Sequence, residues 1–355
     1  MSDPEPSSPA VPALAGQRIL VTGASGFVGR AVVARLLADG AMVSVLVRGR
    51  YHGTGVTCHR GDLRDAAALG PALAGQDSVV HLAYDMRAGG AENLAGFTRL
   101  YDAAQAAGVG RFIQASSAVV YDGWPMAAID ETALIQQPGG GPYRQAKIAM
   151  EQALMDGPMP CVILQPTLVW GPGSAFWTNR YLDVLKRGGA VVLPDPCGAA
   201  ALLYVTDLAA GFAAAAALPD PGRERYLLSG PAPVPWADLM AGYRAVAGAG
   251  TVRQVPLADL RAGLEPENAM DDTAAPPLAA RISARARRII GHDRFEAMMQ
   301  LVHRARGARD LHPDHHLLAL YTGPGHVSTE AARTKLGWRA SIDLEEGLRT
   351  LQSPD

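Results

Sequence analysis

Tyr143 and Lys147 are the two residues whose types and spacing most directly suggest proton-transfer chemistry. They stand four residues apart in the stretch 143–156, whose pattern predicts a helix, so both side chains lie on one helix face. A free phenol has a pKa of about 10 and is a poor base at neutral pH. Because a neighbouring ammonium favours the phenolate, we expect Lys147 to lower the pKa of Tyr143. A substrate hydroxyl or carbonyl beside this pair could exchange a proton with it.

Three glycines near the N-terminus form a G-x-x-G-x-x-G run. They are Gly23, Gly26 and Gly29 in the segment TGASGFVG, which follows a strand candidate and opens a helix candidate. Residues without a Cβ let the backbone approach a phosphate closely, and a helix N-terminus offers free N–H groups and positive potential. At this place in the chain, the run predicts a site for the pyrophosphate of a dinucleotide.

These residues must be positioned by strands and helices that alternate along the first half of the chain. The expected strands are 18–22, 42–47, 78–83, 111–116 and 161–166, and the expected helices are 26–39, 91–107 and 143–156. Such alternation predicts a parallel sheet covered on both faces, an α/β doubly wound fold. Beyond residue 171 we expect extended segments at 202–206 and 226–229, and helices at 279–307 and 328–337.

Composition limits the classes of function. The net charge is −2 and charged residues make up 19% of the chain, so no basic surface is expected for nucleic acid or an anionic membrane. The cysteines Cys58, Cys161 and Cys197 are odd in number and widely spaced, which predicts no disulfide framework and no metal site. Residues 1–15 lack the basic start and apolar run of a signal peptide, so we expect a flexible tail and a cytoplasmic protein.

Three motifs together resemble the extended branch of the short-chain dehydrogenases/reductases, the NAD-dependent epimerase/dehydratase family. They are TGASGFVG, SSAVVY at residues 116–121, and Tyr143-x-x-x-Lys147. The resemblance is strong to about residue 172 and looser beyond it. It implies a Rossmann-type sheet with a smaller mixed α/β substrate domain. We expect a dinucleotide-binding domain over 16–172 and a substrate-binding domain over 173–355, with segments at about 200–230 returning to the first domain.

The resemblance also implies roles for individual residues. Ser117 corresponds to the hydroxyl residue that hydrogen-bonds the reacting substrate oxygen, with Ser116 as the neighbouring alternative. Asn93 resembles the asparagine that holds the catalytic lysine through a water, although it could be a helix-surface residue. The expected catalytic residues are Ser117, Tyr143, Lys147 and Asn93. The residues expected to bind the cofactor are Gly23, Ser25, Gly26, Phe27, Val28, Gly29, Arg48, Asp62, Leu63, Leu82, Ala83, Tyr143, Lys147 and Pro166.

The end of the second predicted strand bears on the choice between NAD and NADP. An acid there would hydrogen-bond the ribose of NAD and repel a 2′-phosphate, whereas an arginine would pair with that phosphate. The strand ends in Val47 and Arg48 without an acid, so NADP(H) is favoured. NAD(H) remains possible if Arg48 is only a solvated loop charge. Asp62 falls where the family side chain meets the adenine, and His81 is expected to be a packed strand residue.

The two residues directly after Ser117 narrow the reaction type. Family dehydratases carry Asp-Glu there, but this chain has Ala118 and Val119, which disfavours elimination of water. Epimerase, reductase and dehydrogenase remain. In each, Tyr143 exchanges the substrate's proton while hydride moves between a carbon and the nicotinamide.

Substrate recognition is less sharply defined by the sequence. Asn179 falls where nucleotide-sugar enzymes often place an asparagine facing the diphosphate, and Arg281 could clamp the same group or lie on a solvated helix face. The leading hypothesis is therefore a nucleotide-activated sugar. A reductase of non-sugar ketones is the alternative, because Gln165 stands where many relatives have arginine.

Two further expectations concern regulation and partners. A non-catalytic NADP-sensing regulator is a third hypothesis, and the retention of Ser117, Tyr143 and Lys147 argues against it. The expected partner is a small-molecule substrate, with no nucleic acid and no membrane. The resemblance also implies a homodimer paired through the helices at 91–107 and 143–156.

Overall fold

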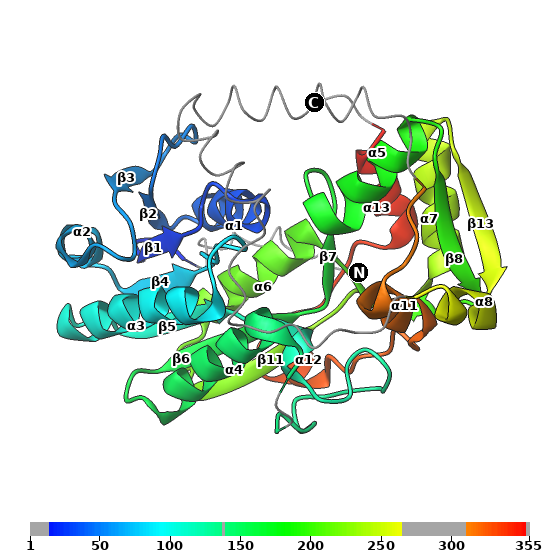
Figure 1. Cartoon of the computed structure of the whole chain (residues 1–355). Coiled ribbons are helices and arrows are strands. Elements are labelled where there is room, and N and C mark those ends of the chain that lie inside the picture. Colours follow the sequence, from blue (N-terminus) through cyan, green and yellow to red (C-terminus); the bar gives the residue numbers. More distant parts are fainter. Residues whose placement is uncertain (1–13, 137–138, 265–309, 353–355) are drawn as a thin grey trace, which may run out of the picture.

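A seven-stranded parallel sheet forms the centre of the structure, a computed structural model that describes residues 14–136, 139–264 and 310–352 (Figure 1). The strand order is β3-β2-β1-β4-β5-β6-β11. These strands are β1 (Arg18–Thr22), β2 (Met42–Val47), β3 (Thr57–Arg60), β4 (Ser78–His81), β5 (Arg111–Ala115), β6 (Cys161–Pro166) and β11 (Arg223–Leu228). The order reverses between β1 and β4, and ligands of doubly wound sheets bind beyond the carboxyl ends of the strands at such a reversal.

Helices cover both faces of this sheet, which confirms the predicted doubly wound α/β fold. On one face, α1 (Phe27–Ala38) packs against α6 (Val205–Ala217). The other face is covered by α2 (Ala66–Leu73), α3 (Gly90–Ala106) and α4 (Gly141–Asp156). Neighbouring residues of a strand point to opposite faces, so Val21 belongs to the first core and Leu20 to the second. Burial on both faces explains the continuous apolar runs of the sequence.

The residues after β6 build a second, smaller group of elements. Its strands pair as β7 (Leu168–Trp170) with β10 (Leu202–Tyr204), β9 (Ala199–Ala200) with β12 (Val234–Pro235), and β8 (Ala190–Asp195) with β13 (Thr251–Pro256). Its helices are α5 (Arg180–Lys186), α7 (Trp236–Ala247), α8 (Leu257–Ala262), α11 (His315–Thr322) and α13 (Leu344–Thr350). Trp170, Trp236 and Tyr321 fill its core. Helix α12 (Glu330–Thr334) instead packs against β11 of the central sheet. The chain returns to the central sheet at β11, which pairs with β6.

Some boundaries differ from the sequence prediction for local reasons. The stretch 202–206 is extended only to Tyr204, because α6 begins at Val205. Leu14, expected in the flexible tail, is fully buried, and its N–H donates to the Asp39 carbonyl at 3.1 Å. The predicted helix at 279–307 lies outside the described residues. Within the described ranges, no helix is both long and apolar enough to cross a bilayer.

Candidate active site

The glycine run forms the turn between β1 and α1 at the carboxyl edge of the sheet. Gly23 has a φ of +73°, and a Cβ there would lie 2.7 Å from the Ala83 backbone nitrogen. A Cβ on Gly29 would overlap the Gly23 carbonyl. Gly26 caps the N-terminus of α1 without a side-chain hydrogen bond. Glycine is therefore required at Gly23 and Gly29. The first N–H groups of α1 follow this turn and can bind a phosphate.

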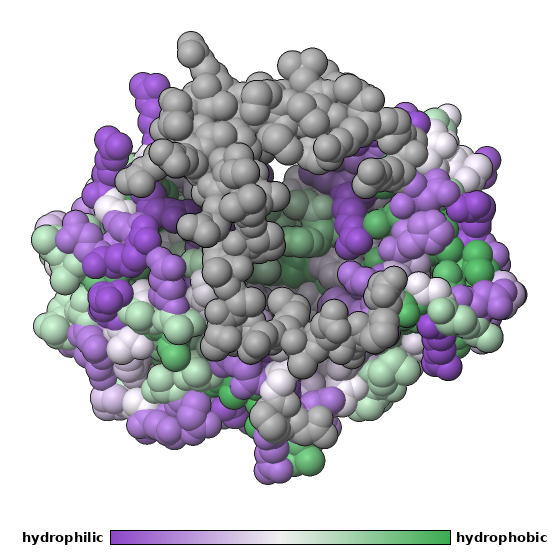
Figure 2. Space-filling model, in the orientation of Figure 1, coloured by the Kyte–Doolittle hydropathy of each residue, from purple (hydrophilic) through white to green (hydrophobic). Residues whose placement is uncertain are grey.

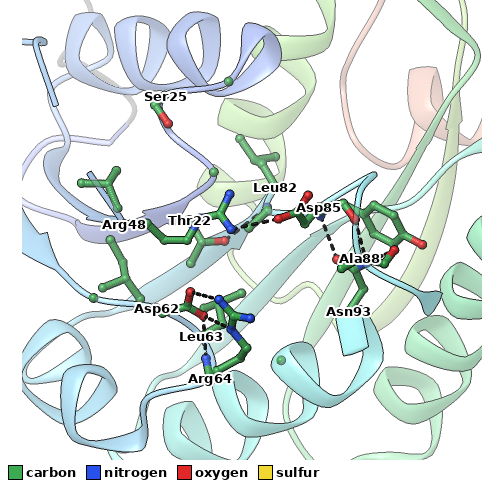
Figure 3. A pocket seen from close by; sticks show the side chains of 18 of the residues that line it. Thr22, Ser25, Arg48, Asp62, Leu63, Arg64, Leu82, Asp85, Ala88 and Asn93 are labelled. Atoms are coloured by element: carbon green, nitrogen blue, oxygen red, sulfur yellow. Dashed lines mark hydrogen bonds and ion pairs between the residues drawn. The ribbon is translucent and has the colours of Figure 1, made fainter. Parts of the chain in front are cut away.

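A pocket of about 310 Å³ opens beside this turn, between the ends of β1, β2, β3 and β4 and the start of α3 (Figure 3). Eight of the predicted cofactor residues line it: Gly23, Ser25, Gly26, Arg48, Asp62, Leu63, Leu82 and Ala83. The other six predicted residues, Phe27, Val28, Gly29, Tyr143, Lys147 and Pro166, do not line this pocket. The pocket therefore collects the residues expected around the adenosine and pyrophosphate of a dinucleotide.

Two arginines border the pocket, each in an ion pair. The Arg48 guanidinium points to the Asp85 carboxylate, with 2.9 Å between Nη1 and Oδ2 (Figure 3). Arg64 pairs with Asp62 at 2.8 Å and with Glu92 at 2.8 Å. The hydrogen bond from Arg64 lowers the pKa of Asp62 below its usual value, despite partial burial. Sequence reasoning missed Arg64, although it stands two residues after Asp62 in the GDLRD segment.

Ser117 and Tyr143 meet where β5 ends and α4 begins. Ser117 precedes a short turn, η1 (Ala118–Val120), where its hydroxyl accepts from the Val119 N–H at 3.3 Å. The same hydroxyl lowers the pKa of the Tyr143 phenol. Ser116 points elsewhere and donates to Glu151. This opposite orientation matches the alternation of side chains at the end of a strand. The geometry thus places Ser117, rather than Ser116, beside the phenol.

Lys147 lies buried one helical turn after Tyr143. Its Nζ donates to the Ala115 carbonyl at 2.7 Å and lies 5.7 Å from the centre of the Tyr143 ring. Burial lowers the pKa of Lys147 to about 8, and the carboxylate of Glu151 partly opposes this. The ammonium is thus held close to its titration point near neutral pH.

The pKa of Tyr143 bears on whether this residue acts as an acid or as a base. Burial raises it to about 12, and the hydrogen bond with Ser117 only partly offsets that rise. Desolvation of the phenolate, the largest of these effects, opposes the lowering that is expected from Lys147 and an oxidised nicotinamide together. A positive charge beside the phenol is therefore required before Tyr143 can serve as a base at neutral pH.

Asn93 contacts a loop in this structure. Its side chain accepts from the Asp85 N–H at 2.8 Å and donates to the Asp85 and Gly89 carbonyls at 3.0 and 3.1 Å. These bonds brace the segment between β4 and α3. The water-mediated support of Lys147 stays a prediction. His81 is buried and bonds Thr22 Oγ1 at 2.7 Å, and burial lowers its pKa to about 3. It is the neutral packed residue that the sequence predicted.

A buried polar cluster behind Lys147 was not expected from the sequence. Glu151, one turn further along α4, accepts hydrogen bonds from Ser116, from Gln165 at 3.0 Å and from Arg225 at 2.9 Å. Gln165 also accepts from the Tyr121 phenol at 2.7 Å. Gln165 thus holds Glu151 and Tyr121 together. The only sequence signal for Glu151 was its four-residue spacing from Lys147.

The predicted substrate residues are less constrained. Asn179 ends the short helix η2 (Ala175–Asn179) and is exposed. Arg281 lies outside the described residues. Within the part of the chain that the structure describes, no group of three or more histidine, cysteine, aspartate or glutamate side chains could hold a metal ion.

Comparisons with known proteins agree with this geometry. A family model described as the NAD dependent epimerase/dehydratase family matches residues 19–228. The 2-alkyl-3-oxoalkanoate reductase of Stenotrophomonas maltophilia is 28% identical over 357 residues, covering 95% of this chain and 98% of the relative. A 3 beta-hydroxysteroid dehydrogenase/Delta 5→4-isomerase of Mycobacterium tuberculosis is 31% identical over 59% of this chain and 64% of its own length. Among solved structures, MoeE5 in complex with UDP-glucuronic acid and NAD has a TM-score of 0.66 at 21% identity, covering 94% of this chain and 97% of that one.

Proposed function

The chain belongs to the NAD dependent epimerase/dehydratase family of NAD(P)-dependent short-chain dehydrogenases/reductases, and on that premise we propose that it is a reductase of a non-sugar ketone. The single observation that carries the chemistry is the placement of Tyr143 and the buried Lys147 one turn apart on α4, where the Ser117 hydroxyl lowers the pKa of the phenol. A phenol, a hydroxyl and an ammonium together can bind a carbonyl oxygen and protonate it.

The residues present fit a dinucleotide, because the glycine turn has no room for a Cβ at Gly23 or Gly29. When bound, the nicotinamide supplies the hydride for the reduction. Ser117 orients the substrate oxygen by its hydroxyl. Tyr143, kept protonated by a high pKa, donates its phenol proton to that oxygen as the alcohol forms. Lys147 then stabilises the phenolate that remains.

Several features support an apolar substrate. The two sequence relatives are named for reactions at a keto acid or a steroid. The side-chain amide of Gln165 is already hydrogen-bonded to Glu151 and Tyr121. The ring of Phe176, on η2, is exposed. Hydrophobic residues are also visible near the middle of the face drawn in Figure 2. The names of these relatives favour the non-sugar ketone over the nucleotide sugar, which was the leading hypothesis from the sequence.

A nucleotide-activated sugar is the second candidate, with epimerisation or reduction as the reaction. The exposed Asn179 favours it, because an amide at the surface could bind a diphosphate. A solved protein of similar fold, MoeE5, is in complex with UDP-glucuronic acid, which supports a ligand of this class.

For the cofactor we propose a preference for NADP(H). Arg48 and Arg64 both lie at the pocket, and their guanidinium groups could pair with a 2′-phosphate. Dissociation constants for NADPH and NADH would test this, and we expect NADPH to bind more tightly. Arg48→Asp should flatten or reverse the ratio, whereas equal affinities in the starting protein would refute the preference.

The substrate proposal is tested with purified protein and NADPH against 2-alkyl-3-oxoalkanoates, steroid ketones and UDP-sugars. We expect oxidation of NADPH with an apolar ketone, and Tyr143→Phe should retain NADPH binding while losing most of the turnover. Turnover with UDP-sugars alone would establish the second candidate, and unchanged turnover in Tyr143→Phe would remove this residue from the mechanism. Light scattering would test the expected homodimer through α3 and α4.

A further inference from the structure

Tyr84 is a second aromatic residue in the site, beside the proposed catalytic tyrosine. It follows β4 closely and lines the cofactor pocket. Its ring lies edge-on to the Tyr143 ring, with 4.9 Å between centres and an interplanar angle of 79°. This T-shaped geometry is a favourable one for two aromatic rings. The contact therefore restricts the orientation of the phenol that meets Ser117.

The same ring faces the Lys147 ammonium. Lys147 Nζ lies 5.0 Å from the centre of the Tyr84 ring, which is closer than its 5.7 Å to the Tyr143 ring. A cation within about 6 Å of a ring centre is attracted by the ring's electrons, and the attraction strengthens away from water. The other titratable groups that act on Lys147 are Glu151 on α4, which favours its charged form, and the neutral His81 of β4. The Tyr84 ring is therefore a second group that favours the charged form.

The backbone around Tyr84 is held by its neighbour. Asp85 is clamped at its N–H and carbonyl by Asn93, while its carboxylate pairs with Arg48 (Figure 3). Tyr84 thus stands at the point where a braced loop passes from the adenosine side of the pocket to the catalytic pair. The position of the Tyr84 ring is set by its contacts with Tyr143 and Lys147.

We propose that Tyr84 is a positioning residue of the active site, whose ring fixes the Tyr143 phenol against Ser117 and holds the Lys147 ammonium beside it. This inference rests on the proposed function for its effect on turnover. Its effect on Lys147 itself does not depend on turnover, so it can be tested separately.

The test compares Tyr84→Leu, which removes the ring but keeps the site apolar, with Tyr84→Phe, which keeps the ring. Tyr51→Leu, a half-buried tyrosine in the segment after β2, serves as the matched control. For Tyr84→Leu we expect kcat for ketone reduction to fall about tenfold, with NADPH affinity nearly unchanged. Tyr84→Phe and Tyr51→Leu should stay close to the starting protein.

A second measurement follows the charge of Lys147 directly. The sequence contains three lysines, Lys147, Lys186 and Lys335, so an NMR titration of labelled lysine side chains can resolve each one. We expect Tyr84→Leu to lower the pKa of Lys147 by about one unit and to leave the other two unchanged.

The outcomes separate this inference from the proposed function. An unchanged Lys147 titration in Tyr84→Leu, or equal losses of kcat in Tyr84→Phe and Tyr84→Leu, would overturn the role of the ring. Loss of NADPH binding in Tyr84→Leu would also overturn it, because Tyr84 would then be a cofactor contact. Failure of the starting protein to reduce any ketone, with the titration shifted as expected, would refute the proposed substrate and leave the Tyr84–Lys147 contact intact.

Discussion

Lys147 is a buried cation, and replacing it with methionine should stabilise the fold while it abolishes turnover. Burial lowers the pKa of Lys147 from 10.5 to about 8, so holding it charged at neutral pH costs roughly 3 kcal/mol of folding free energy. Methionine has a similar length and no charge. It removes the hydrogen bond from Lys147 to the Ala115 carbonyl, which keeps the Gln114 amide as a donor, and the loss costs about 1 kcal/mol. We therefore expect Lys147→Met to raise the free energy of unfolding by about 2 kcal/mol.

The pKa shift of Lys147 also makes the stability of the protein depend on pH. The unfolded chain binds more protons than the folded one between the folded pKa of about 8 and the unfolded value of 10.5. The stability of the starting protein should therefore rise with pH across this window, whereas Lys147→Met should lack that rise. The advantage of the variant over the starting protein should be largest below pH 8 and should shrink towards pH 10.5.

Urea denaturation at neutral pH and at pH about 10 measures the free energy of unfolding and its change with pH. NADPH oxidation measures the loss of turnover. Lys186→Met is the control, because Lys186 is exposed in the last turn of α5 and its removal should leave stability unchanged. A variant of Lys147 that is less stable than the starting protein at neutral pH would show that the buried ammonium stabilises the fold. Stability and activity would then not be in conflict at this position, and the expected trade-off would be wrong.

Three further substitutions probe the other parts of the site. Gly23→Ala forces a Cβ against the Ala83 backbone at a positive φ, so it should lower the free energy of unfolding in urea by about 2 kcal/mol. It should also weaken NADPH binding in a fluorescence titration, and unchanged binding would contradict a phosphate site at the glycine turn. Glu151→Ala removes a buried carboxylate that accepts from Ser116, Gln165 and Arg225, and it should lower the free energy of unfolding by about 3 kcal/mol. The exposed Glu330→Ala should not measurably change the free energy of unfolding, and equal effects would refute a stabilising role of the buried carboxylate. Ser117→Ala should reduce kcat about a hundredfold, with unchanged stability in thermal unfolding. A kcat near that of the starting protein would exclude Ser117 from catalysis.

The local patterns of the sequence were sufficient for the fold class and for much of the site. Alternating strands and helices predicted the doubly wound sheet, because burial on both faces demands apolar strands. The glycine run predicted the turn at Gly23, because only glycine fits its backbone. The spacing of Tyr143 and Lys147 placed both on one face of α4, because a helix repeats every four residues or so.

The tertiary structure alone decided which partners these residues meet. Arg225 reaches Glu151 from β11, which is 74 positions away along the chain, and Tyr84 meets Tyr143 only because β4 and α4 converge at one edge of the sheet. The pKa of Tyr143 depends on burial, which the packed chain creates and no local pattern encodes. The assembled fold determines which distant segments come into contact and which groups lose contact with water. Spacing and backbone constraints depend only on neighbouring residues, so the sequence shows them directly.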